Sequence, residues 1–284
     1  MKKGINYWSF ADGTPLRKAA ELAKDAGFQG IEYCMAETGE LGLDATESDI
    51  RSVKTMTESV GLEIASLASW VPWEHSLTSD DPKHRQIARD VVKRLIEAGA
   101  ILGVDTVLVV PGYVGVDFVA GSEICRYDEV YDRALEAIGY LEPFARSHGV
   151  AMGIENVWNK FLLSPLEFRS FIDSFASPFV GAYFDVGNVV LTGYPEQWIH
   201  ILGKRIKKVH FKDYRRNPGG FGAFVDLLAG DVDYPAVMAA FREVGYDGYC
   251  NAEMMPPYKH FSEQIIYNTS ATMSTIFGSI GKEE

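Results

Sequence analysis

The stretch from residue 150 to residue 188 reads VAMGIENVWNKFLLSPLEFRSFIDSFASPFVGAYFDVGN, and its pattern decides the fold. Two short runs rich in apolar residues, Ala151–Val157 and Val180–Asp185, flank a segment with helical periodicity from Pro165 to about Ser174. Apolar runs of about 4–8 residues are typical of buried strands. A strand, a helix and a second strand in this order predict parallel pairing through a right-handed crossover.

The same two-part unit recurs in both directions along the chain. Strands are expected at Gly4–Phe10, Gly30–Met35, Leu62–Ser69, Thr106–Pro111, Ala151–Val157, Val180–Asp185, Ile206–Lys212 and Gly248–Met254. Helices are expected from Pro15 to Ala26 with Thr14 as N-cap, and at Ala45–Val60, Pro82–Leu102, Tyr127–His148, Pro165–Ser174, Pro195–Leu202, Tyr234–Val244 and Phe261–Phe277. Eight such units in roughly 250 residues are the number that closes a barrel, so the sequence predicts one (β/α)₈ TIM barrel domain over residues 1–284.

A doubly wound open sheet is the rival architecture for alternating strands and helices. That fold normally carries a glycine-rich phosphate-binding turn after its first strand. The corresponding segment here reads SFADGT over residues 9–14, which lacks such a turn. The barrel is therefore the favoured fold class.

Composition narrows the classes of partner. The 284 residues carry a formal net charge of -12, and such an acidic chain repels phosphate backbones and anionic lipid. Neither a nucleic acid nor a membrane surface is therefore expected as a partner. The three cysteines form no CxxC pair, and the first eight residues lack the apolar stretch of a secretory signal. Together these features predict a cytoplasmic protein.

Metal-capable side chains stand at or near the carboxyl ends of four consecutive expected strands. They are Glu155, Asp185, His210 and Glu253. Catalytic residues of barrels lie at this end of the strands, so the four are expected to converge. Three carboxylates and an imidazole suit one divalent ion, with Mn²⁺ favoured and Mg²⁺, Co²⁺ or Zn²⁺ as alternatives. For any one of these acids alone, a helix cap or a salt bridge is the competing interpretation.

The motifs around these residues resemble those of a known superfamily. They read Ile-Glu155-Asn, Phe-Asp185-Val-Gly-Asn188, Val-His210-Phe-Lys-Asp213 and Ala-Glu253-Met. The chain resembles the xylose isomerase-like TIM barrels over essentially its whole length, and most of all their ketose 3-epimerases and L-ribulose/L-xylulose-5-phosphate 3-epimerases. The resemblance implies a sugar or sugar-phosphate isomerase or epimerase that is metal-dependent and assembles as a dimer or tetramer.

The resemblance also implies roles for single residues. Glu155 and Glu253 would be the acid/base pair as well as metal ligands, and Arg216 would bind a substrate oxygen. Free-ketose epimerases often have a histidine at the position of Asn188, whereas the phosphopentulose epimerases have an asparagine there, as this chain does. The free-ketose epimerases also carry a second glutamate shortly after the first, where this chain reads Asn159-Lys160-Phe161 and has no acid. Both departures favour a phosphorylated or otherwise acidic sugar.

Other side chains near the strand ends are candidates for substrate contact. Lys212, Arg215 and Arg216 precede a Gly219–Gly222 segment, and barrels often bind phosphate in the loops after their last two strands. A solvated basic loop is the alternative. Trp158 and Tyr113 could supply an apolar face to a sugar, although such residues also pack the top of a barrel.

The chemistry favoured by this set is ketose 3-epimerisation by two-glutamate proton transfer through an enediolate. A sugar or cyclitol dehydratase of the same superfamily, such as an inosose or dehydroshikimate dehydratase, is the alternative enzyme. An endonuclease IV-like DNA repair enzyme would need more histidine ligands and a basic face. A non-catalytic sugar-binding barrel would not need the acid/base pair.

Overall fold

The computed structural model describes residues 1–255 and 258–278. Within them, eight parallel strands form a closed barrel in the order β1-β10-β7-β6-β5-β4-β3-β2. The barrel strands are β1 (Lys2–Asn6), β2 (Gly30–Met35), β3 (Glu63–Ser69), β4 (Thr106–Val109), β5 (Ala151–Glu155), β6 (Val180–Asp185), β7 (Ile206–Phe211) and β10 (Tyr249–Ala252). The predicted (β/α)₈ fold class is therefore confirmed.

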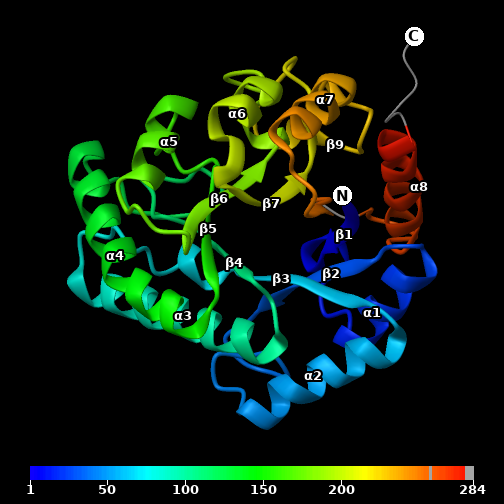
Figure 1. Ribbon diagram of the computed structural model, residues 1–284, viewed down its shortest axis with the longest axis horizontal. Coiled ribbons are helices and arrows are strands. Elements are labelled where there is room, and N and C mark those ends of the chain that lie inside the picture. Colours follow the sequence, from blue (N-terminus) through cyan, green and yellow to red (C-terminus); the bar gives the residue numbers. More distant parts are fainter. Residues whose placement is uncertain (256–257, 279–284) are drawn as a thin grey trace. The chain divides into compact units, whose positions relative to one another are not determined.

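Helices follow the strands along the chain, as the colours of Figure 1 show from blue to red. They are α1 (Leu16–Asp25), α2 (Glu47–Val60), α3 (Pro82–Leu102), α4 (Tyr127–His148), α5 (Pro165–Asp173), α6 (Pro195–Leu202), α7 (Tyr234–Val244) and α8 (Gln264–Gly278). In the described part of the chain, no helix is both long and apolar enough to cross a membrane.

Helices with strong capping signals in the sequence begin and end at the predicted residues. For α3, the Asp81 carboxylate accepts the Lys83 N–H at 2.8 Å, and Pro82 fills the first helical position, where no N–H is needed. The helix ends at Gly103, whose φ of 85° is left-handed and disfavours any residue with a side chain.

The first strand and the first helix cap differ from the prediction. The strand was expected to reach Phe10 but ends at Asn6, where the Asn6 side chain accepts the Trp8 N–H at 2.7 Å and starts a 3₁₀ turn over Tyr7–Ser9. Thr14 does not cap α1, because its hydroxyl donates to the Ala11 carbonyl oxygen at 2.6 Å instead.

The chain packs as two compact units. The first comprises residues 1–33, 55–65 and 184–284, and its buried aromatic side chains include Phe211, Tyr234 and Phe241. In this unit β10 pairs with β1 and with β7, and β1 pairs with β2.

The second unit comprises residues 34–54 and 66–183. In it β5 pairs with both β4 and β6, and all three strands are buried. Phe161 and Phe171 lie edge to face with centroids 6.1 Å apart, and Tyr131 contacts both rings. Glu155 is the last residue of β5, and Asp185, which belongs to the first unit, is the last of β6.

Candidate active site

Each of the four predicted metal ligands sits at the end of a barrel strand or one residue from it. Glu155 and Asp185 end β5 and β6, His210 is the penultimate residue of β7, and Glu253 directly follows β10. The Glu253 N–H donates to the Phe211 carbonyl oxygen at 3.0 Å, so the ladder between β10 and β7 continues through this residue. All four side chains are buried, with Asp185 and His210 fully inaccessible to solvent.

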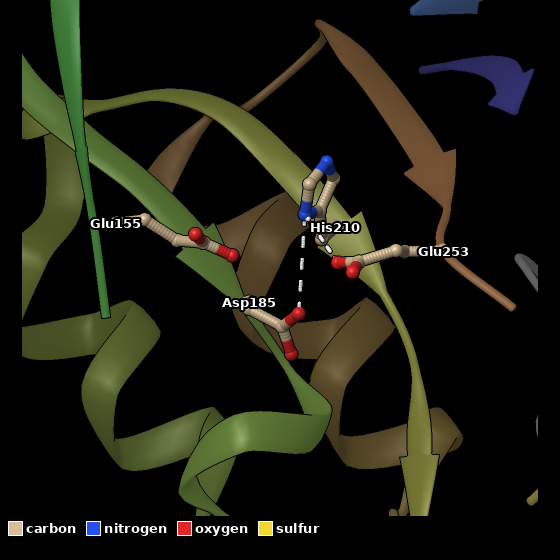
Figure 2. A group of neighbouring side chains, drawn as sticks. All are labelled: Glu155, Asp185, His210 and Glu253. Atoms are coloured by element: carbon tan, nitrogen blue, oxygen red, sulfur yellow. Dashed lines mark ion pairs between the residues drawn. The ribbon is translucent and has the colours of Figure 1, made fainter. Parts of the chain in front are cut away.

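The four side chains offer ligand atoms that all lie within 4.8 Å of one another. Figure 2 shows the four side chains converging on one place. The imidazole Nδ1 of His210 is 2.9 Å from Glu253 Oε2 and 3.9 Å from Asp185 Oδ2. Without a cation, the three carboxylates of this group would repel one another. A divalent ion fits the donor set, since carboxylate oxygen and imidazole nitrogen suit Mn²⁺, Mg²⁺, Co²⁺ and Zn²⁺.

Lys212 adds a positive charge to this cluster. Its Nζ lies 3.0 Å from Glu253 Oε2 and 3.3 Å from Asp185 Oδ2, and it sits 4.9 Å from the centre of the Phe224 ring. The sequence suggested that this lysine belongs to an anion-binding loop. The structure instead buries it against two of the candidate metal ligands.

Burial and charge act in opposite directions on the two acids next to Lys212. Burial raises the pKa of Asp185 above its usual range, and the nearby Lys212 ammonium only partly opposes this effect. Burial also disfavours the ionised form of Glu253, but Lys212 and His210 outweigh it and lower the pKa of this carboxyl group. The network therefore holds Glu253 as a carboxylate.

A close backbone approach positions Asp185 and Lys212. Gly187 begins the 3₁₀ turn Gly187–Val189, and a Cβ at this position would lie 2.8 Å from the Lys212 Cβ. Only glycine fits such a gap without moving the end of β7. The turn also directs the Asn188 N–H to Asp185 Oδ1 at 2.8 Å, which orients the carboxylate.

A small hairpin follows β7 and was not predicted. Its strands are β8 (Asp213–Tyr214) and β9 (Phe224–Val225). Asp213 is fully buried at its base, and its carboxylate accepts the N–H groups of Tyr214, Leu228, Gly230 and Val232 at 2.8–3.1 Å. These four bonds fix the loop that follows Lys212.

Both arginines of the hairpin donate to main-chain carbonyl groups. Arg215 Nε donates to the Ala229 oxygen at 2.8 Å, and Arg216 Nε donates to the Val190 oxygen at 3.0 Å. The Arg216 guanidinium also lies 5.2 Å from the centre of the Tyr194 ring. In this arrangement the arginines hold the hairpin in place, and substrate binding by Arg216 stays a prediction.

The two predicted aromatic contacts belong to the second unit. Tyr113 is almost fully buried, and its N–H donates to Thr78 Oγ1 at 3.0 Å. Burial raises the pKa of its phenol. Trp158 is half-buried in the loop after β5. A role of either side chain in binding substrate stays a prediction.

Glu32 is a member of the network that sequence reasoning missed. It lies in β2, is fully buried, and its Oε1 is 2.7 Å from His210 Nε2. The signal was a lone carboxylate inside the strand GIEYCM over residues 30–35. Ionisable residues are almost never fully buried without a partner, so this position could have been flagged, although its partner could not have been named.

Comparison with known proteins finds proteins named as sugar epimerases among those similar to this chain. It is 26% identical over 244 residues to the Escherichia coli (strain K12) protein named "Putative L-ribulose-5-phosphate 3-epimerase SgbU", covering 82% of this chain and 81% of that protein. D-psicose 3-epimerase from Clostridium cellulolyticum H10 has the same fold, with a TM-score of 0.80, 16% identity and 98% and 99% of the two chains covered. The 3-keto-D-glucoside 4-epimerase YcjR from E. coli aligns with a TM-score of 0.77, 17% identity and 98% and 99% coverage.

All three are named as epimerases, a subclass of the isomerases, the first of them as a putative one. At 16–17% identity the two solved structures bear only on the fold. The sequence profile described as "Xylose isomerase-like TIM barrel" matches residues 20–267. That match spans well over half of the chain and includes all four acid and imidazole groups at the strand ends. The protein therefore belongs to the xylose isomerase-like TIM barrel family.

Proposed function

We propose that the protein is a divalent-metal-dependent sugar or sugar-phosphate epimerase, with inversion at carbon 3 of a ketose as its favoured reaction. The observation that carries this proposal is the buried group of Glu155, Asp185, His210 and Glu253. It combines a ligand set for one hard cation with two carboxylates able to move protons. Similarity to the protein named as a putative L-ribulose-5-phosphate 3-epimerase also supports this proposal.

The chemistry needs an acidified carbon–hydrogen bond next to a carbonyl group. A metal held by these four residues would supply a Lewis acid for the carbonyl oxygen. Glu155 and Glu253 are the two proton-transfer groups in this proposal. Their strands are separated in the barrel order by β6 and β7, so the two carboxylates would approach a bound sugar from different sides. One removes the proton and the other delivers a proton to the opposite face, which inverts the carbon.

The remaining predicted residues complete a site for a small polar substrate. Asn188 is largely buried next to Asp185, and Lys212 provides a cation beside Glu253. Trp158 and Tyr113 would supply apolar surface, and Arg216 would contact a hydroxyl or phosphate oxygen. Manganese is the favoured ion, and a cytoplasmic dimer or tetramer is the expected form of the enzyme.

A substrate panel tests the proposed function directly. Pentuloses and hexuloses, each with and without a phosphate group, would be incubated with the Mn²⁺-loaded protein in D₂O. Epimerisation with deuterium incorporated at the inverted carbon is the expected result. Deuterium at the neighbouring carbon would indicate an isomerase, and a dehydrated product would indicate the alternative lyase. A panel without any exchange would overturn the proposal.

Removing the metal is expected to abolish turnover and to lower the melting temperature. Binding to the native state stabilises a protein by about 2.7 kcal/mol when the ligand is present at 100 times its dissociation constant. Chelation followed by thermal unfolding measures this loss, and adding Mn²⁺ should restore both properties. Asp185→Asn is the matched variant, and its melting temperature should respond little to the ion. Equal activity before and after complete chelation would contradict metal dependence.

Replacing Arg216 by alanine tests which part of the substrate this residue contacts. If it contacts a phosphate, the Arg216→Ala variant should lose far more kcat/KM on phosphorylated sugars than on free sugars. Arg215→Ala is the matched control, because its guanidinium also donates to a main-chain carbonyl group. An equal loss on both substrate types would make Arg216 a partner of sugar hydroxyl groups. Loss of folding in both variants alike would leave Arg216 a structural residue.

A further inference from the structure

A fully buried layer of polar side chains lies directly behind His210 in the first unit. It consists of Asn6 on β1, Glu32 on β2 and Asn251 on β10, each with no solvent exposure. Side chains inside a barrel are normally bulky and apolar. A carboxylate placed among them is costly unless it is paired, so its presence calls for a specific role.

The partners of the Glu32 carboxylate define that role. The Asn6 amide donates to Glu32 Oε1, and the Asn251 amide donates to Glu32 Oε2 at 3.4 Å. His210 Nε2 is 2.7 Å from Glu32 Oε1. Strand register supports this arrangement, because Asn6 lies opposite Glu32 and Asn251 lies opposite His210.

The backbone makes room for this layer. Gly4 lies opposite Asn251 in the pairing of β1 with β10, and a Cβ at Gly4 would come within 1.9 Å of Asn251 Oδ1. Any larger residue would push the asparagine off the carboxylate. A glycine, two amides and an acid from three strands are thus fitted together around one ring nitrogen of His210.

From this arrangement we infer that Glu32 is a positioning residue that keeps a proton on His210 Nε2 and so directs Nδ1 to the candidate metal site. Amide groups donate to both oxygens of the Glu32 carboxylate, which favours its ionised form. An ionised carboxylate only accepts hydrogen bonds, so the hydrogen between Glu32 and His210 belongs to the imidazole Nε2. Nδ1, the nitrogen that faces Glu253 and Asp185, is then the one left to bind a cation. Figure 2 shows one ring nitrogen turned toward these acids and the other turned away from them.

The consequence concerns metal binding and therefore rests on the proposed function. Carboxylates that accept the distal N–H of a ligating histidine fix the ring and raise its basicity, and their loss typically costs about 10–100-fold in metal affinity. Glu32→Gln removes the charge and adds an amide that can donate to Nε2, which would favour the wrong tautomer. This variant should lose about 10–100-fold in Mn²⁺ affinity, measured by competition with a chelating dye.

Glu63→Gln is the matched control. Glu63 is also a strand carboxylate of the first unit, but its partners are Lys2 Nζ at 2.7 Å and the Tyr249 hydroxyl group at 2.7 Å. This variant should change thermal stability without changing Mn²⁺ affinity. Glu32→Asp keeps the charge but withdraws it from Nε2, so its Mn²⁺ affinity should fall between those of the native protein and Glu32→Gln.

The position of the proton on His210 can be measured in the native protein, so this test does not depend on whether a variant folds. Nitrogen-15 spectra of the metal-free native protein distinguish Nε2–H from Nδ1–H imidazole, and the His210 signal is the one missing from His210→Gln. A proton on Nε2 is expected, and a ring protonated on Nδ1 alone would overturn the inference. Unchanged Mn²⁺ affinity in folded Glu32→Gln would also overturn it. A native protein that binds no Mn²⁺ would contradict the proposed function, while the tautomer would still decide the role of Glu32.

Discussion

Replacing either Glu155 or Glu253 by glutamine is expected to lower epimerisation by about 10²–10⁴-fold or more, the range for loss of a positioned general base. Glutamine keeps the size of the side chain and one weak oxygen ligand, so each variant should retain part of its metal. The two losses should be similar, because inversion needs a base on one face of the planar intermediate and an acid on the other.

The two variants should differ in which of the two epimers they can still deprotonate. Each surviving glutamate can remove the substrate proton on its own face, so each variant should exchange one epimer's proton with solvent while net conversion fails. Solvent-deuterium incorporation into the two pure epimers, followed by NMR, measures this directly. Near-normal conversion in either variant would rule out the two-base assignment.

Glu167→Gln serves as the control for these substitutions. Its carboxylate accepts the Tyr127 hydroxyl group at 2.7 Å and the Leu163 N–H at 2.9 Å in the first turn of α5. Losing this charge should affect stability modestly and leave proton exchange in both directions intact. A similar loss of exchange in Glu167→Gln would show that the effect is not specific to the proposed acid/base pair.

Replacing Asp213 by alanine is expected to destabilise the protein by about 2–6 kcal/mol, since each buried donor left without a partner costs about 1–3 kcal/mol. Two of the four N–H groups that it accepts, those of Tyr214 and Val232, are buried. The partly buried N–H groups of Leu228 and Gly230 can recover water when the loop loosens. Urea unfolding measures the total loss.

Local measurements separate this effect from a general loss of stability. Hydrogen exchange should accelerate first at the amides of Leu228, Gly230 and Val232, because these are the bonds removed. Asp231→Ala is the control. Its carboxylate is exposed and accepts the Arg216 N–H at 2.7 Å. Gly230→Ala should act like Asp213→Ala, because its Cβ would lie 2.2 Å from Asp213 Oδ1. Unaltered exchange in both loop variants would show that Asp213 does not hold the loop.

Most strands and helices could be predicted from the sequence because their signals are local. Caps, glycines in left-handed conformation and apolar periodicity act over a few neighbouring residues, and α3, α4, α6 and α7 begin and end where these signals lie. The prediction of where the first strand ends was wrong, and the reason is also local. Its apolar run continues to Phe10, but the Asn6 side chain turns the backbone before the run is complete.

The barrel topology extended this local information to the candidate site. Once strands and helices alternate, the carboxyl ends of the strands share one end of the barrel, so residues at those ends become candidates together. The prediction of Glu155, Asp185, His210 and Glu253 needed only their position in each strand. Neither side-chain orientation nor distance entered it.

Tertiary structure decided the contacts that join residues far apart in the chain. Glu32 lies 178 positions before His210, so no pattern in β2 could identify its partner. Lys212 was assigned to a basic loop by its neighbours in sequence, but the close approach at Gly187 buries its ammonium between Asp185 and Glu253. Local sequence thus determined which residues reach the strand ends. Which groups share a proton or a charge there depends on distances of about 3 Å, which only the packed strands fix.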